Sequence, residues 1–402
     1  MRVRSRRFGV VLVLVGLFLA LLAAEGLAYL ALLLRPTGNP LAYATREADL
    51  NFYLASDGWN FYAIKPNHRQ RFRRDEFSTT VRLNNLGFRE DEDYRGQPID
   101  VGFVGDSFTF GHGVDAGERY SDLVRRSLGN KNVSAFAYAN GHAPPQYYLF
   151  LKANPHLVPR RLIIGLFPWN DLAGDIADFD LITDPTGALA QIRSKGIRVR
   201  EDGFLTSAGS DLRPEPWWRR ALRDFHVGRV LLLAHYRLTT PDWRPLERSS
   251  ATPAAAATKE PDAVDRGTLD EHARIALEYT ERLVDLVRAA HGEVIVFYIP
   301  VSYVVGDYPY FCQTISGYDA ATCIALQRQN VLGEELARWA ANRCLTLVDP
   351  VAPFREIERG GRQLYFAKDG HWTRRGHRAA ADLVLTALAK PVSAECAPPV
   401  NR

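Results

Sequence analysis

Residues 99–107 read Ile-Asp-Val-Gly-Phe-Val-Gly-Asp-Ser. The run from Ile99 to Val104 is short, half β-branched and bounded by glycine and proline, which predicts a buried strand. Asp106 and Ser107 are residue types that begin helices, so a helix is expected directly after the strand. A simple helix cap explains this pair, and a nucleophilic serine at a strand end explains it equally well. Other segments have to decide between the two.

The rest of the chain predicts the fold around this strand. Strands alternating with helices favour a parallel sheet covered by helices on both faces. With five strands, we expect an α/β flavodoxin-like three-layer sandwich with a five-stranded parallel sheet. The expected strands are 99–104, 133–138, 162–167, 294–299 and 345–349, and the expected helices lie near 117–129, 145–154, 268–290, 324–342 and 373–389.

Two further segments place hydrogen-bond donors after predicted strands. The backbone N–H of Gly141 follows the second strand, and the amide of Asn170 follows the third. Ligands bind at the carboxyl edge of such sheets, and an oxyanion needs donors that converge from different segments. Far downstream, Asp369-Gly370-His371 supplies an imidazole with a carboxylate two residues before it. Serine, histidine and an acid together are typical of nucleophilic catalysis.

Other chemistries lack their motifs. No lysine follows the glycines after Ser107 as a phosphate-binding loop requires, and Thr109 stands where a nucleophile elbow needs glycine. The chain has no His-x-x-x-His or Cys-x-x-Cys pair and no nicotinamide or flavin fingerprint. We therefore expect no metal and no cofactor.

The order of Gly105-Asp106-Ser107, Gly141, Asn170 and His371 resembles the SGNH (GDSL-type) hydrolase family. By this resemblance Ser107 is the nucleophile, His371 the base and Asp369 its partner. The resemblance also implies an oxyanion hole made by the N–H groups of Ser107 and Gly141 and by the Asn170 amide.

One block departs from the family pattern. The usual block is Asp-x-x-His, but Lys368 stands three residues before His371, so the acid here is Asp369. The Asp-x-His block is similar to that of periplasmic polysaccharide O-acetyltransferases, in which it precedes the serine. An ordinary Asp-Gly turn is the alternative explanation of Asp369.

Three polar residues near these motifs have simpler explanations. We expect Asp106 and Asp171 to hold backbone groups by capping rather than to take part in chemistry. A structural or surface role is favoured for His142, although it follows Gly141 directly.

The N-terminus predicts a location. Residues 1–7 carry four arginines, and 8–34 are apolar except for Glu25. This span is about 40 Å long as a helix, enough to cross a hydrocarbon core of about 30 Å. Arginines before the span predict a cytoplasmic N-terminus and a periplasmic or extracytoplasmic catalytic domain on the inner (cytoplasmic) membrane. A retained single-pass anchor is favoured over a cleaved signal peptide: Leu22-Ala23-Ala24 makes a poor cleavage site, although Gly26-Leu27-Ala28 is a passable one.

Charge and cysteine content agree with export. The net charge of +4 comes from residues 1–35, which hold five arginines and one glutamate, so the remainder is neutral and gives no support for nucleic-acid binding. Four cysteines suit an oxidising compartment. Cys312 and Cys323 are the favoured disulfide, which leaves Cys344 with Cys396.

The chain divides into segments of different character. We expect a cytoplasmic tail at 1–7, an anchor at 8–34, a juxtamembrane arm at 36–98 with a hairpin through Gln70 to Leu83, a catalytic domain at 99–390, and a tail at 391–402. Aromatic residues of the arm could contact the bilayer, but packing on the catalytic domain is favoured. An insertion at 173–265 could form a lid or a separate structural subdomain. It contains Trp217-Trp218-Arg219-Arg220, a helix candidate at 230–238 and an Ala/Ser/Thr-rich stretch at 249–257.

Three functions fit these residues. The first is an exported esterase that hydrolyses an acylated glycan, a lipid or a small ester. The second is an O-acyltransferase acting on cell-envelope polysaccharide, which would need a membrane partner presenting acyl groups or an already acylated polymer. The third is a non-catalytic glycan-binding module, which has no need for all four of Ser107, Gly141, Asn170 and His371. Residues alone do not separate the first two functions.

Overall fold

The structure is a computed structural model that describes residues 2–34, 49–74, 76–129, 132–139, 142–214, 216–239, 261, 266–267 and 269–390. The chain forms two compact units. The first, called here the helical unit, contains helices α1 (Arg2–Leu34), α6 (Trp217–Leu222) and α7 (His226–Thr239). The second, called the α/β unit, contains Leu50–Phe72, Glu76–Leu212 and the described residues after 249.

A five-stranded parallel sheet forms the centre of the α/β unit. Its strands lie in the order β13-β12-β7-β5-β6, and every neighbouring pair is parallel. In chain order this is the flavodoxin-like arrangement 2-1-3-4-5, as the sequence predicted. Each strand lies within two residues of its expected bounds. The strands are β5 (Val101–Gly105), β6 (Val133–Ala137), β7 (Arg161–Leu166), β12 (Glu293–Tyr298) and β13 (Thr346–Val348).

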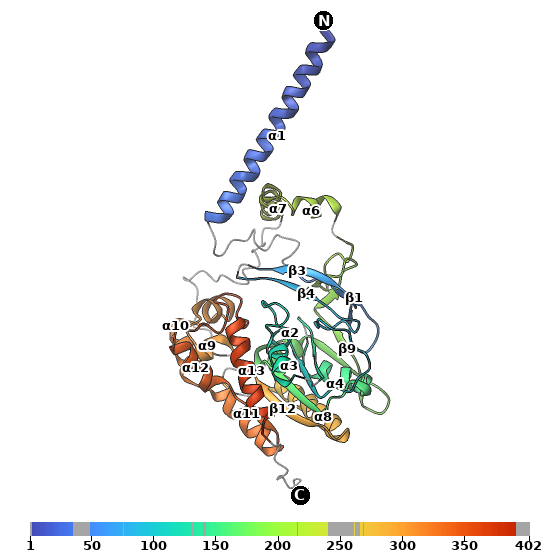
Figure 1. Ribbon diagram of the computed structural model, residues 1–402, viewed down its shortest axis with the longest axis vertical. Helices are drawn as coiled ribbons and strands as arrows, with labels where there is room; N and C mark the ends of the chain where they lie inside the picture. The colour runs from blue at the N-terminus through green and yellow to red at the C-terminus, as the bar shows by residue number, and fades with distance from the viewer. Residues whose placement is uncertain are drawn as a thin grey trace. The chain divides into compact units, whose positions relative to one another are not determined.

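Helices cover both faces of this sheet (Figure 1). On one face, α3 (Tyr120–Leu128) packs against α13 (Arg374–Leu388). On the other face, α4 (Pro144–Ala153) packs against α8 (Glu271–Ala289). Strands β5, β6, β7 and β12 are nearly continuous apolar runs and almost entirely buried, as expected for a parallel sheet with both faces covered, whereas the edge strand β13 is half-buried.

The helix expected at 324–342 is in fact two helices, so this prediction was wrong. Helix α10 (Ala320–Arg328) ends before Gln329, and α11 (Val331–Asn342) begins after Asn330. The Asn330 amide donates to Asp349 Oδ2 at 2.7 Å, which ties the break to the loop after β13. Asparagine is a common residue before a helix start, and it marks the break. Trp339 of α11 donates to Glu281 of α8 at 3.0 Å, so α11 lies on the same face as α8.

The region before β5 contains two small sheets. Strands β1 (Tyr53–Ala55) and β2 (Tyr62–Ile64) pair antiparallel, and β3 (Arg69–Arg73) pairs with β4 (Ser78–Arg82) where a hairpin was expected. Aromatic residues of this region lie in the core of the α/β unit rather than on its surface, among them Phe52, Phe72 and Phe88.

The segment expected as one insertion at 173–265 is divided between the two units. Its first part forms the antiparallel pairs β8 (Phe179–Thr183) with β9 (Leu189–Ser194) and β10 (Ile197–Val199) with β11 (Leu205–Ser207), all in the α/β unit. Its second part contributes α6 and α7 to the helical unit. The stretch 249–257 lies outside the described residues.

Shorter elements complete the α/β unit. They are α2 (Ser107–Phe110), η2 (Pro155–Leu157), η3 (Asn170–Gly174), α5 (Asp175–Ala177), α9 (Ser302–Val305), η5 (Tyr310–Ile315) and α12 (Val351–Arg359). The Cys312–Cys323 disulfide is confirmed and links η5 to α10. Cys396 and the tail at 391–402 lie outside the described residues, so the second pairing stays a prediction.

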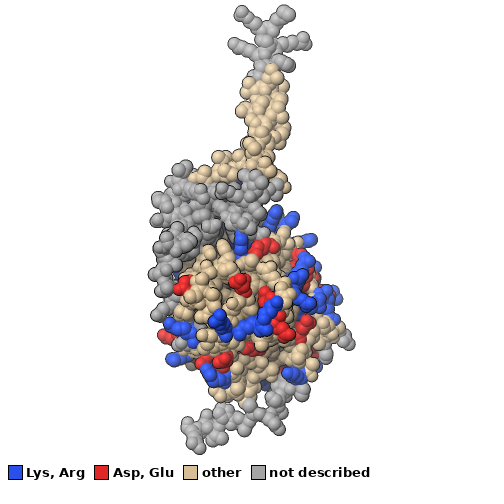
Figure 2. All heavy atoms as spheres, turned by 90° about the vertical axis from the view of Figure 1, so that its left-hand side faces the viewer, with Lys and Arg blue, Asp and Glu red and all other residues tan. Residues whose placement is uncertain are grey.

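Helix α1 is long and apolar enough to cross a membrane. Its segment Val11–Leu30 has a mean hydropathy of 2.5. The helix begins at Arg2, so the basic residues expected as a tail are its first turns. Figure 2 shows no arginine or lysine on the part of α1 that is not drawn in grey, whereas positive and negative side chains are interspersed over the visible face of the α/β unit.

Candidate active site

Ser107 is the first residue of α2, directly after β5. Asp106 caps this helix, because its Oδ1 accepts from Phe108 N at 2.9 Å. The turn is possible only with glycine at 105, since a Cβ there would lie 2.1 Å from Thr109 Oγ1. Thr109 is held in turn by a 2.8 Å hydrogen bond with the Tyr120 hydroxyl. Ser107 therefore lies at the carboxyl edge of the sheet, where β5 ends.

His371 and Asp369 come from a tight turn before α13. Phe366 N donates to His371 O at 2.8 Å and Gly370 N to Phe366 O at 3.2 Å, which closes the turn. Gly370 has a positive φ of 81°, and a Cβ there would lie 2.3 Å from the Phe311 ring. Only glycine fits both requirements. With Gly370 in this conformation, the side chains on either side of it point to the same place.

Serine, histidine and aspartate form one hydrogen-bonded chain. His371 Nε2 lies 2.7 Å from Ser107 Oγ, and His371 Nδ1 lies 2.6 Å from Asp369 Oδ1. Because a carboxylate only accepts, Nδ1 carries the proton toward Asp369 and Nε2 presents its lone pair to the serine hydroxyl. In the family block the acid stands three residues before the histidine, a position that Lys368 occupies here. The structure places Asp369, two residues before the histidine, against the imidazole instead.

The charges around Asp369 keep it ionised. Its burial would raise the pKa, but the charges and hydrogen bonds of His112 and His371 outweigh burial and hold the pKa well below its usual range. Asp369 is therefore a carboxylate at neutral pH.

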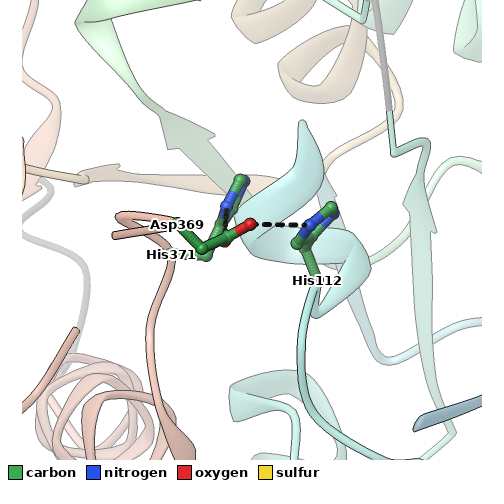
Figure 3. A group of neighbouring side chains, drawn as sticks. All are labelled: His112, Asp369 and His371. Atoms are coloured by element: carbon green, nitrogen blue, oxygen red, sulfur yellow. Dashed lines mark hydrogen bonds and ion pairs between the residues drawn. The ribbon is translucent and has the colours of Figure 1, made fainter. Parts of the chain in front are cut away.

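His112 is a member of the site that the sequence analysis missed. Its Nε2 lies 3.4 Å from Asp369 Oδ2, so each carboxylate oxygen faces one imidazole (Figure 3). Its ring also stacks on that of His371, with centroids 4.1 Å apart. The local signal was its place between Gly111 and Gly113, both with positive φ, which turn the chain back toward the serine.

Glu76 was also missed, and it holds the acid's loop in place. Its carboxylate accepts from the backbone N–H groups of Ala367, Lys368 and Asp369 at 2.8 to 2.9 Å. Glu76 lies in the turn between β3 and β4, nearly 300 residues from its partners. No sequence pattern predicts a contact between Glu76 and a loop so far along the chain.

Asn170 is hydrogen-bonded to Asp106, the residue that precedes the serine. Asn170 Nδ2 donates to Asp106 Oδ2 at 3.1 Å. The amide nitrogen carries two hydrogens, so this bond orients the group and leaves a second N–H for another acceptor. Asn170 begins the π-helical turn η3, a type of turn that recurs at functional sites. Gly141, the other expected oxyanion donor besides Ser107, lies outside the described residues.

The neighbouring polar residues hold backbone, as expected. Asp171 is fully buried and accepts from Phe167 N at 2.7 Å and from the Tyr147 hydroxyl at 2.8 Å. His142 is buried, with Nδ1 2.9 Å from Gly105 O. Burial, only partly opposed by this hydrogen bond, lowers the pKa of His142 to about 3, so it is neutral and supports the strand end.

Burial gives Asp106 an unusual titration. Despite its hydrogen bonds and the charge of His371, burial raises the pKa of Asp106 to about 6 from the usual 3.8. The folded state therefore binds more protons than the unfolded state between these pH values, and stability falls as the pH rises through them.

An Asp106→Asn variant tests this titration. At pH 7 the ionised Asp106 destabilises the wild type by about 2 kcal/mol relative to pH 4. We expect the difference in unfolding free energy between variant and wild type to grow by about this amount from pH 4 to pH 7. Urea titrations of residues 36–402 at several pH values measure it. Parallel profiles for the two proteins would contradict the assignment.

Within the described residues, His112, Asp369 and His371 are also a group with the spacing of metal ligands, their ligand atoms lying within 4.8 Å of one another. A metal on His371 Nε2 would compete with Ser107 for the same lone pair. The hydrogen-bonded chain uses all three side chains without a metal.

Comparisons with known proteins give only distant likenesses. No family model matches the chain, and no curated protein matches it. Among solved structures, a lipolytic G-D-S-L family protein from Veillonella parvula is 13% identical, with 73% of this chain and 100% of that chain covered and a TM-score of 0.36. A putative acylhydrolase from Bacteroides fragilis is 14% identical, with 74% and 93% covered and a TM-score of 0.34. TesA is 13% identical, with 72% and 98% covered and a TM-score of 0.33. Likeness at this level assigns no activity, which has to follow from the site itself.

Proposed function

We propose that this chain is a membrane-anchored, extracytoplasmic serine esterase that acts through an acyl-serine intermediate. The observation that carries the proposal is the unbroken chain of hydrogen bonds from Ser107 Oγ through His371 to Asp369. A hydroxyl becomes a nucleophile when a base takes its proton and a third group orients the base. The hydroxyl, the base and the orienting group are all present here, and they come from two distant segments of the chain.

The first half of the reaction forms the acyl-enzyme. As Ser107 Oγ attacks the ester carbonyl carbon, its proton passes to His371 Nε2. Asp369 stabilises the resulting imidazolium through the Nδ1–H bond and itself stays ionised. Collapse of the tetrahedral intermediate breaks the ester C–O bond, and His371 returns the proton to the departing alkoxide oxygen.

The second half releases the acid. A water molecule gives a proton to His371 Nε2 and attacks the acyl carbon. The bond to Ser107 Oγ then breaks, and His371 protonates the serine again. The products are a free carboxylic acid and an enzyme ready for the next cycle.

The oxyanion of both intermediates needs donors in fixed positions. We assign this role to the N–H groups of Ser107 and Gly141 and to the second N–H of Asn170 Nδ2. Asp106 supports the assignment because it accepts the first N–H and so fixes the plane of the amide. Such prepositioned donors need no reorganisation during the reaction.

An Asn170→Ala variant should lower kcat by about 10² to 10³ with little change in KM, since the donor acts on charge that develops after binding. Steady-state kinetics with p-nitrophenyl acetate measure this change. Asn154→Ala is the matched control, because the side-chain amide of Asn154 donates to Phe150 O at the end of α4. Equal kcat values for Asn170→Ala and the control would remove Asn170 from the oxyanion hole.

The proposed substrates are acylated glycans, lipids or small esters. Residues 36–402 should hydrolyse p-nitrophenyl acetate without an acceptor sugar. Turnover that appears only when an acceptor oligosaccharide is added would replace hydrolysis by acyl transfer. No turnover under either condition would leave a binding module.

The proposed location rests on α1. Its apolar length and the arginines at its start support a single-pass anchor in the cytoplasmic membrane, with the N-terminus inside. An alkaline phosphatase fused after residue 390 should be active in intact cells. An inactive but stable fusion would contradict this topology.

A further inference from the structure

The helical unit contains a polar contact in an unexpected place. Glu25 is the only charged residue of the apolar segment Val11–Leu30. Its Oε1 accepts from His226 N at 2.7 Å and its Oε2 from Val227 N at 2.9 Å, so it caps the N-terminus of α7. Its Oε1 also lies 2.7 Å from His226 Nδ1, and the His226 ring packs edge-on against Tyr29.

This contact fixes the position along the axis of α1 at which α7 begins. Ionisable side chains in membrane spans are costly unless they are paired, and Glu25 finds three donors at the start of a helix, where negative charge is favoured. Glu25 lies about 8 Å along the helix from Leu30, the end of the apolar segment. The start of α7 is therefore held at the boundary between the apolar part of α1 and its exit (Figure 1).

The helices α6 and α7 expose apolar side chains at this level. Beyond α1, the exposed large apolar side chains of the described residues are concentrated here: Trp217 (75% exposed), Trp218 (44%), Phe225 (55%), Val230 (40%) and Leu231 (57%). On α7, Val230 and Leu231 share a face with Val227 and Ala234, at the spacing of one side of a helix. A surface of this kind is stable only if something covers it.

The charges of the same segment are almost all positive. Residues 216–239 contain five arginines and a single acidic residue, Asp224. The Arg219 guanidinium lies over the Trp218 ring, 5.2 Å from its centre. Exposed tryptophan combined with arginine is the composition of helices that lie in the membrane interface, where the rings enter the headgroup region and arginines meet anionic headgroups.

We propose that α6 and α7 lie flat in the interface of the membrane that α1 crosses, bound to anionic phospholipid, with Glu25 joining the two elements. The inference rests on the anchor of the proposed function and goes beyond it. The chain would then hold the membrane by a spanning helix and by a second, in-plane element, which limits the rotation of the helical unit about α1.

Spin labels on the full-length chain test this arrangement. The described residues contain no free cysteine, and labelling of the unsubstituted chain measures any background from Cys396. Leu231→Cys and Trp217→Cys report on α7 and α6, Leu17→Cys on α1 serves as the lipid reference, and Leu54→Cys on β1 serves as the aqueous reference. Collision with oxygen and with a water-soluble nickel complex is measured in vesicles of phosphatidylcholine with and without phosphatidylglycerol.

The expected result is a nickel accessibility at positions 217 and 231 several-fold below that at 54, with oxygen accessibility close to that at 17, and deeper burial when phosphatidylglycerol is present. Labels as accessible to nickel as the one at 54 would overturn the proposal. Labels shielded from both agents would also overturn it, because a protein surface, such as a second copy, would then cover the helices.

The role of Glu25 is tested with the same label at 231. Glu25→Leu removes the cap of α7 while leaving α1 more apolar, so the label should move toward water. Ala20→Leu, which introduces the same leucine side chain at an exposed position of α1, should leave the label in place. An unchanged label in Glu25→Leu would refute the joining role. Resistance of the wild type to alkaline extraction from membranes checks the anchor separately, so a failure of α1 to insert is distinguishable.

Discussion

Replacement of Ser107 by alanine is expected to lower kcat for p-nitrophenyl acetate by about 10⁶, to the rate left by the oxyanion donors alone. Among the described residues, the Ser107 hydroxyl is the nucleophile that lies at hydrogen-bonding distance, 2.7 Å, from His371 Nε2. Binding of the ester should change little, because the missing atom acts only when the carbonyl is attacked.

A covalent probe gives a second readout for Ser107. A fluorophosphonate should add one mass increment to the wild type, on the peptide that contains Ser107, and none to Ser107→Ala. The matched control is Ser127→Ala, since the Ser127 hydroxyl donates to Leu123 O within α3. It should keep both activity and labelling. Activity that survives Ser107→Ala would remove the nucleophile and with it the proposed mechanism.

Replacement of Asp369 by alanine should lower kcat by about 10⁴. Without the carboxylate, nothing holds the Nδ1–H tautomer of His371, and the imidazolium loses its stabilising charge. The loss of kcat should persist at alkaline pH, because alanine has no group whose deprotonation could restore the negative charge. The stacked ring of His112 keeps His371 near its position, so the fold should survive.

The control for Asp369 is an aspartate of the same α/β unit. Asp382→Ala changes an exposed residue of α13, the helix that follows the catalytic turn, and should retain full activity. Circular dichroism and the unfolding midpoint show whether either variant is damaged globally. A folded Asp369→Ala protein with near wild-type kcat would mean that another acid, such as Asp106, orients the base.

Much of the fold could be predicted because its signals are local. Each strand of the sheet is a short apolar run between turn residues, so its bounds follow from a few neighbours. The break between α10 and α11 was missed because the tertiary bond from Asn330 to Asp349 lies outside any local window. The division of the insertion was missed for a similar reason, since the contact between Glu25 and α7 joins residues about 200 positions apart.

The candidate site shows the same limit. Ser107, Asn170 and His371 stand next to strand ends or a turn, and such positions can be recognised in a sequence. His112 and Glu76 act on Asp369 from other segments, at distances along the chain of more than 250 residues. The glycines on either side of His112 indicate a turn, but neither they nor the residues around Glu76 identify Asp369 as the partner.

By itself, the sequence determined the sheet, the serine at its edge and the apolar helix before it, because periodicity and turn residues encode these features over short ranges. Only the tertiary structure decided between Asp369 as the partner of His371 and an ordinary turn at that position, showed that a second histidine and Glu76 support this acid, and showed which helices accompany α1. These contacts form between side chains that are distant in the sequence and meet within hydrogen-bonding distance in space. Whether they meet depends on the backbone conformation of Gly370 and on how whole helices and strands pack.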